Sequence, residues 1–251
     1  MSDARYLSRP WGRLAYYYER SHEPTLVLIH GAWCDAEDWN STLPFLPPGH
    51  GILRFDLRGH GRSDGPNGPV AFDDHLDDIL ALLDYLDLAA PVLVGHSLGG
   101  MLSMRLAERH PRRVRGLALL EGWTYLGVPW KEKGQMHGML PDAMIGRIRR
   151  KWDETQRRWP QAVLADYWET VRRADASRFL ATTRLPVLEI YGERGEPRPT
   201  RDELAIPDRP NVELVWLEGA GHYLPLEVPG PVGQAISAWL EQWRLTPAKW
   251  A

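Results

Sequence analysis

The stretch "VLVGHSLGGMLSMRLAERH", residues 92–110, decides the fold. An apolar run leads into Gly95-His96-Ser97-Leu98-Gly99, and a helical pattern follows it. The G-x-S-x-G pattern is a weak signal alone, but between a buried strand and a helix it indicates a serine nucleophile. The chain must reverse within a few residues, which strains Ser97 and exposes its hydroxyl above the sheet edge. A side chain in place of either glycine would collide with the neighbouring strand or helix.

Ser97 also lies at the predicted start of a helix, where backbone amides favour developing negative charge. The alternative is an ordinary glycine-rich turn between a strand and a helix, with Ser97 as a capping residue. We favour the nucleophile because other parts of the chain supply the groups that a serine nucleophile requires.

Short apolar runs alternate with helical patterns along the rest of the chain. Several runs are continuously apolar, as parallel strands covered on both faces must be. The helical pattern at residues 72–88 has an apolar stripe, and we expect its aspartates to face water. The alternation predicts an α/β fold, a mostly parallel sheet with helices on both faces. The expected strands are 14–19, 25–31, 52–57, 91–96, 114–122, 186–192 and 212–219.

The region 124–179 breaks this alternation. It is helical in propensity, rich in arginine and tryptophan, and too long for an ordinary connection. We expect a helical insertion, a lid, over the sheet end where the strand 114–122 finishes. The core domain is then formed by 1–123 and 180–251. The alternative is a surface excursion whose tryptophans only pack it down.

Two further segments fit a serine nucleophile. The turn His30-Gly31-Ala32 follows a strand, and the N–H groups of Ala32 and Leu98 would form an oxyanion hole. Near the C-terminus, "LEGAGHYLPLEVPG" places His222 in a glycine-rich loop after the last strand. A histidine there can take the Ser97 proton as general base. His30, His60 and His96 we interpret as structural.

Four motifs carry a resemblance to a known family: "HGAW" (30–33), "DLRGHGRSD" (56–64), "GHSLGG" (95–100) and "GAGHYLPLEVP" (219–229). In this order and spacing the chain resembles the α/β-hydrolase superfamily, from Gly12 to Trp243. The resemblance implies an eight-stranded, mostly parallel sheet whose first short strands are antiparallel. It also implies a Ser–acid–His order of catalytic residues, which Ser97 and His222 match.

The acid departs from the family pattern, because Gly195 occupies the usual aspartate position after the strand 186–192. Glu196 lies beside that position but out of register with it. Glu121 ends the strand that lies beside the Ser97 strand in the family's sheet, and some haloalkane dehalogenases resemble this arrangement. We therefore expect Glu121 to be the acid, with Glu196 as the alternative.

These parts suit acyl transfer to water through an acyl-enzyme. The leading hypothesis is hydrolysis of a small or medium apolar carboxylic ester or lactone, without a metal or organic cofactor. Trp33, Trp123 and Trp130 are candidate pocket walls. The alternatives on the same fold are a C–C bond hydrolase and a cofactor-free perhydrolase. An alternative of another class is a catalytically inactive ligand-binding receptor.

Composition excludes several kinds of partner. The net charge of −3 gives no electrostatic reason to expect nucleic acid or an anionic membrane. Cys34 is the only cysteine, so an intrachain disulfide and a Cys-rich zinc site are excluded. The N-terminus lacks the apolar region of a signal peptide, and no run of about 18 apolar residues exists. We expect a cytoplasmic protein with a small-molecule substrate, either monomeric or homodimeric.

Overall fold

The sheet of this protein has eight strands in the order β1-β2-β4-β3-β5-β6-β7-β8. The computed structural model describes residues 3–128, 138, 140–193 and 198–246 of the chain. Strand β2 runs antiparallel to both its neighbours, β1 and β4, and the other strand pairs are parallel. The strands are β1 (Arg5–Arg9), β2 (Gly12–Glu19), β3 (His22–Ile29), β4 (His50–Phe55), β5 (Val92–His96), β6 (Gly116–Leu120), β7 (Val187–Glu193) and β8 (Val212–Glu218).

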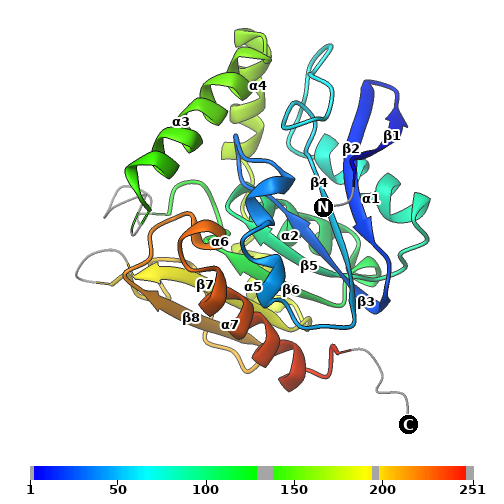
Figure 1. Cartoon of the computed structure of the whole chain (residues 1–251). Coiled ribbons are helices and arrows are strands. Elements are labelled where there is room, and N and C mark those ends of the chain that lie inside the picture. Colours follow the sequence, from blue (N-terminus) through cyan, green and yellow to red (C-terminus); the bar gives the residue numbers. More distant parts are fainter. Residues whose placement is uncertain (1–2, 129–137, 139, 194–197, 247–251) are drawn as a thin grey trace.

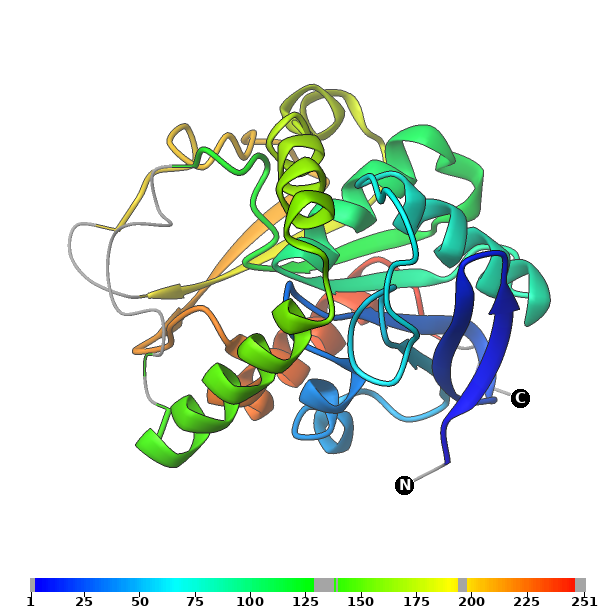
Figure 2. The ribbon, with the colours of Figure 1, turned by 90° about the horizontal axis from the view of Figure 1, so that it is seen from above.

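Helices cover both faces of this sheet (Figures 1 and 2). Apolar residues of α1, α2 and α5 pack on one face, and those of α6 and α7 pack on the other. Short 3-10 helices occupy residues 36–39, 43–45 and 111–113. The α-helices are α1 (Asp74–Tyr85), α2 (Leu98–Arg109), α3 (Asp142–Arg157), α4 (Gln161–Arg172), α5 (Ser177–Thr182), α6 (Leu224–Glu227) and α7 (Pro229–Gln242).

The strands predicted from apolar runs are confirmed as β2 to β8. Strand β1 is missing from the prediction that rests on the residues, and only the resemblance to the family implied it. Its five residues are half-buried or exposed, so the sequence "RYLSR" carries no apolar run. It is held by its antiparallel pairing with β2 at the sheet edge.

The aspartates of α1 were expected to face water, but one of them does not. Asp78 is 1% exposed, and its carboxylate accepts hydrogen bonds from Arg9 at 3.0 Å, Arg58 at 3.0 Å and the indole of Trp11 at 2.8 Å. The expectation was wrong for Asp78 because two arginines and an indole from distant parts of the chain supply the donors that water would provide.

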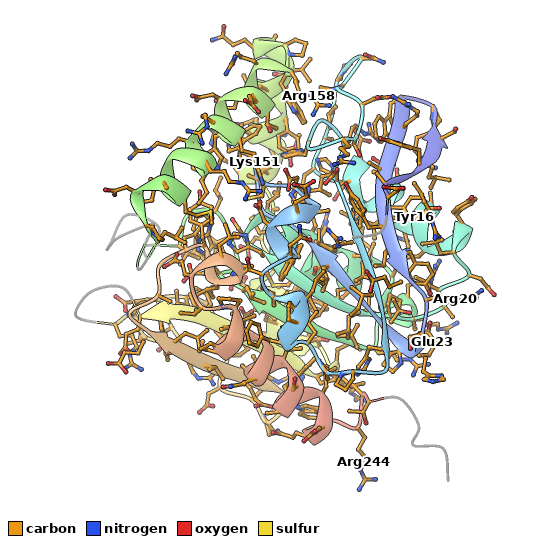
Figure 3. The ribbon with its side chains drawn as sticks, in the orientation of Figure 1. Tyr16, Arg20, Glu23, Lys151, Arg158 and Arg244 are labelled. Atoms are coloured by element: carbon orange, nitrogen blue, oxygen red, sulfur yellow. The ribbon has the colours of Figure 1, made fainter. Side chains whose placement is uncertain are left out.

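Helices α3 and α4 lie between β6 and β7 in the sequence and stand on the opposite side of the molecule from α7 (Figure 1). The Lys151 ammonium of α3 bonds the carboxylates of Asp35 and Asp38 at 3.0 and 2.6 Å. The Arg158 guanidinium, just after α3, donates to the Gly61 carbonyl at 2.7 Å. Figure 3 labels Lys151 on α3 and Arg158 just after it. Ion pairs and hydrogen bonds therefore fasten α3 to the loops after β3 and β4.

In the described part of 124–179, no strand of the sheet occurs, and one isolated bridge joins Tyr125 to Asp175. The described residues of this range include α3, α4 and the start of α5, in agreement with the predicted helical propensity. Across the described ranges, no helix has both the length and the apolar character needed to cross a membrane.

Candidate active site

Ser97 lies at the turn between β5 and α2, with backbone angles φ 52° and ψ −116°. Positive φ is uncommon for a residue with a side chain, so this turn is strained. The backbone N–H of Ser97 donates to the Leu120 carbonyl at 2.9 Å, which fixes the turn to the neighbouring strand β6. A Cβ at Gly99 would overlap the carbonyl oxygen of Ile29, and one at Gly95 would overlap that of Gly99. The two glycines thus give the turn the space that it needs.

The turn after β3 lies against Ser97. A Cβ added at Gly31 would be 3.1 Å from the Ser97 Cβ, so the backbone of this turn runs close beside the serine. Ala32 follows directly in the chain. Leu98 is the first residue of α2, where helix geometry leaves the backbone N–H without an acceptor inside the helix. The two residues predicted to form an oxyanion hole therefore flank Ser97 from two segments.

His222 and Glu121 are in contact, although 101 residues separate them in the chain. His222 Nδ1 lies 3.4 Å from Glu121 Oε2, and the side chains are 6% and 0% exposed. The other carboxylate oxygen of Glu121 accepts a hydrogen bond from the Gly192 N–H at 2.9 Å. A carboxylate held at Nδ1 fixes the imidazole so that Nε2 is the free nitrogen.

The loop that carries His222 is joined to the Ser97 turn. His96 Nε2 donates to the backbone carbonyl of His222 at 2.8 Å, and the two imidazole rings are 4.9 Å apart. On another side, the indole ring of Trp123 stacks on the imidazole of His222. The Ser97 turn, the His222 loop and the end of β6 therefore form one packed unit.

Backbone strain is concentrated around this unit. Seven described residues other than glycine have positive φ, and four of them belong to the predicted site. A bulky residue at positive φ costs on the order of 1–3 kcal/mol, which the surrounding packing must offset. Such strain is typical of functional turns. The four residues are Trp33 (61°), Ser97 (52°), Glu121 (51°) and Trp123 (33°).

The histidines interpreted as structural have backbone partners. His30 Nε2 accepts from the Leu57 N–H at 2.9 Å, so its Nδ1 is the nitrogen that donates to the Gly31 carbonyl at 2.7 Å. His60 Nδ1 lies 3.0 Å from the Arg58 carbonyl, and burial lowers the pKa of His60 well below its ordinary value. These contacts brace the loops after β3 and β4.

An aromatic layer joins the turn after β3 to the helical segment. We define this layer as Trp33, His60, Trp159, Tyr167 and Trp168. Trp33 stacks on His60 with ring centroids 5.7 Å apart, and it meets Trp159 and Trp168 at 6.4 and 5.7 Å. Trp33, predicted as a pocket wall, thus lies beneath residues of α4 and the loop before it.

His75 lies next to this layer, and no signal in the sequence marked it. Its imidazole packs edge-on against Tyr167 at 5.5 Å. Among the described residues, neither ring nitrogen of His75 has a hydrogen-bond partner, and nor does the Tyr167 hydroxyl. Burial, together with the charge of Arg58, lowers the pKa of His75 to about 3. His75 is therefore a neutral imidazole held between the core and α4.

Glu189 is a second buried carboxyl near the site. It is 1% exposed in the middle of β7, and within the described ranges neither of its oxygens has a hydrogen-bond partner. Burial raises its pKa well above the ordinary value, opposed by the charge of Arg201 and reinforced by that of Glu121. The one signal in the sequence was an acidic residue inside the apolar run 187–191.

Two predicted residues, Trp130 and Glu196, lie outside the described residues. Glu193, one of the acidic residues around Gly195, forms an ion pair with Arg198. Among the described residues, no group of three or more His, Cys, Asp or Glu side chains is arranged to hold a metal ion.

Comparison with known proteins agrees with this architecture. Residues 24–191 match the family described as alpha/beta hydrolase fold. The chain is 28% identical to the dihydrolipoyllysine-residue acetyltransferase component of the acetoin cleaving system of Pseudomonas putida, over 92% of the chain and 68% of that protein. It is 25% identical to (E)-2-((N-methylformamido)methylene)succinate hydrolase of Acinetobacter baylyi, over 91% and 95%. The crystal structure of a hydrolase from Pseudomonas aeruginosa PA01 is 25% identical, with a TM-score of 0.75 over 95% of this chain and 98% of that one.

Proposed function

Because the chain belongs to the alpha/beta hydrolase family, we propose that it is a serine hydrolase with Ser97 as nucleophile, His222 as base and Glu121 as acid. The proposed substrate is a small or medium apolar carboxylic ester or lactone. The observation that carries the proposal is the 3.4 Å contact between His222 and Glu121. The loop that bears His222 is also hydrogen-bonded to the turn that bears Ser97.

In the proposed reaction, the Ser97 hydroxyl attacks the substrate carbonyl while His222 takes its proton. The resulting oxyanion accepts hydrogen bonds from the N–H groups of Ala32 and Leu98. Glu121 stabilises the imidazolium, which then returns the proton to the departing alkoxide. Water, activated by His222, cleaves the acyl-enzyme and restores Ser97.

Glu121 is proposed as the acid because its contacts suit that role. The carboxylate is fully buried, it accepts from the Gly192 N–H, and it lies at the Nδ1 edge of His222. The hydrogen bond from the Gly192 amide holds the carboxylate in place beside the imidazole. A contact of 3.4 Å is long for a charged pair, but such contacts often tighten when substrate binds.

The segment 124–179 is proposed to act as a lid over this site. The fastening of α3 by Lys151 and the packing of the aromatic layer on Trp33 support a closed arrangement. Trp33, Trp123 and Trp130 are proposed as walls of the acyl pocket. Aromatic walls favour an apolar acyl group.

Replacement of Ser97 tests the function. Ser97→Ala should keep the fold and lower kcat on p-nitrophenyl esters by several orders of magnitude. A fluorophosphonate probe should label the wild type and not the variant. Retention of esterase activity by Ser97→Ala would rule out the nucleophile. A wild-type protein that neither labels nor hydrolyses any ester of a graded panel would instead fit a ligand-binding receptor.

A matched pair of variants tests the acid. Glu121→Gln should lower kcat by about 10² to 10⁴, as loss of a triad acid does. Glu196→Gln should change kcat little, provided that both variants keep the wild-type circular dichroism spectrum. The reverse pattern would place the acid in the loop after Gly192.

A further inference from the structure

Trp123 occupies a tight turn directly after β6, two residues beyond Glu121. Its indole ring stacks on the imidazole of His222, with ring centroids 5.0 Å apart and an interplanar angle of 29°. The same turn therefore presents a carboxylate to the edge of His222 and an aromatic face to its plane.

The backbone holds this arrangement at a cost. Glu121 and Trp123 have φ of 51° and 33°, a conformation that bulky residues rarely adopt. The Trp123 side chain is 8% exposed, and its indole N–H has no hydrogen-bond partner among the described residues. A buried indole usually finds such a partner. A wholly apolar side chain would fill the same space without burying an unpartnered N–H donor.

We infer that Trp123 is a positioning residue for His222, whose ring face stabilises the imidazolium that forms when His222 takes the Ser97 proton. This inference rests on the proposed function, because it assigns a role to the imidazolium of that mechanism. The two groups act on different sides of the ring. Glu121 fixes the Nδ1 edge, and Trp123 covers one face.

The geometry suits an interaction with charge. A cation within about 6 Å of an aromatic centroid is attracted by the ring quadrupole, and tryptophan attracts it most strongly. The attraction is greatest where water is excluded, and His222 is 5% exposed. The interaction grows when the imidazole becomes charged, so it stabilises the transition state more than the resting enzyme.

A large apolar ring can also act in the opposite direction, by excluding water from the imidazole. A ring that only excludes water would destabilise the imidazolium and make His222 less basic. The two effects shift the titration of His222 in opposite directions. The direction of the shift on removal of the ring therefore decides between them.

The test compares Trp123→Phe and Trp123→Leu with the wild type. The control is Trp11→Leu, since Trp11 lies in the distant turn between β1 and β2 and stacks on Arg58. For each protein, kcat and KM on a p-nitrophenyl ester are measured across pH 5 to 9. We expect the midpoint of the acid limb of kcat/KM to move to lower pH by about half a unit in Trp123→Leu. The shift should be smaller in Trp123→Phe and absent in the control.

The same order should appear in kcat, with a loss of about threefold to tenfold in Trp123→Leu and a smaller loss in Trp123→Phe. If the leucine variant does not fold, the comparison of wild type with Trp123→Phe still measures the direction in which the midpoint shifts. An unchanged midpoint, or a midpoint that moves to higher pH, would overturn the inference.

An NMR titration of the His222 ring separates this inference from the proposed function, because it needs no turnover. The His222 signal is assigned by its loss in His222→Gln. A lower titration midpoint in Trp123→Leu would support stabilisation of the His222 imidazolium by Trp123 even in a protein without esterase activity. Equal midpoints in an active enzyme would reject the role of Trp123 and leave the proposed function intact.

Discussion

Replacement of His75 by phenylalanine should flatten the acid side of the stability profile. The imidazole is buried and neutral in the folded protein, with its pKa lowered from 6.5 to about 3 by burial and by the charge of Arg58. In the unfolded chain it regains its ordinary value. The unfolded state therefore binds more protons between these limits, and the free energy of unfolding falls as pH falls. Well above pH 6.5 the His75 imidazole is neutral in both states and does not lower the free energy of unfolding. Below about pH 6.5 the unfolded chain takes up the proton and the free energy of unfolding falls progressively.

The magnitude follows from the two values. From pH 7 to pH 5, a single group with pKa values of 6.5 unfolded and about 3 folded removes about 2 kcal/mol of stability. The groups facing His75 are Arg58, His30 and Tyr167, and none of them is changed by the substitution. Phenylalanine keeps an edge-on ring against Tyr167 and removes two nitrogens that have no described partner. The variant should therefore lose about 2 kcal/mol less than the wild type over this interval.

Urea unfolding at pH 7, 6 and 5 and constant ionic strength, followed by far-UV circular dichroism, measures this difference. His110→Gln serves as the control, because His110 is exposed and its replacement should leave the wild-type slope unchanged. Equal pH slopes for the wild type and His75→Phe would refute the argument that His75 is a buried neutral imidazole. His60 remains in both proteins, and because burial is the largest cause of its lowered pKa and His75 only a minor one, its contribution largely cancels.

Three further predictions concern the fold around the site. Gly99→Ala should prevent folding or greatly destabilise the protein, since its Cβ would overlap a backbone carbonyl of β3, whereas Gly68→Ala, with nothing within 4 Å, should be tolerated in thermal unfolding. Glu189→Gln should gain stability relative to the wild type as pH rises above about 4.5. Burial raises the pKa of Glu189, so the unfolded wild type releases this proton at a lower pH than the folded protein does, and its free energy of unfolding falls as pH rises; equal pH profiles would contradict this. Asp78→Asn should cost roughly 3–5 kcal/mol in urea unfolding, since it leaves buried Arg58 and half-buried Arg9 without their partner, while exposed Asp77→Asn should cost little.

The fold was predictable because its signals are local. The apolar runs gave the strands β2 to β8, and the glycines around Ser97 gave the turn between β5 and α2. Strand β1 lacked such a signal, since its residues are not buried and its pairing with β2 is a contact between two segments. Asp78 was misjudged for a related reason. A helical pattern shows which residues face water only when nothing else covers that face, and Arg9, Arg58 and Trp11 cover it here.

The candidate site was predictable only in part. The resemblance to the family implied that the strands before Ser97 and Glu121 lie side by side, so these two residues were expected at one edge, and the structure confirms that β5 and β6 are neighbours. The buried Glu189 and the unpartnered His75 were not expected, because burial of a single polar residue depends on packing between distant segments. The catalytic roles remain predictions that the variants above test.

The proposed position of the acid has a structural explanation at Gly192. A Cβ there would overlap the backbone carbonyls of Ala220 and Gly221, so the end of β7 packs backbone to backbone on the loop that carries His222. A close approach of this kind leaves the Gly192 N–H inside the site, in need of an acceptor. Glu121 supplies it with one carboxylate oxygen and turns the other to His222. An acid from the end of β6 thus satisfies the backbone of β7 and the imidazole together. An acid placed after Gly192 would leave that amide to find another partner.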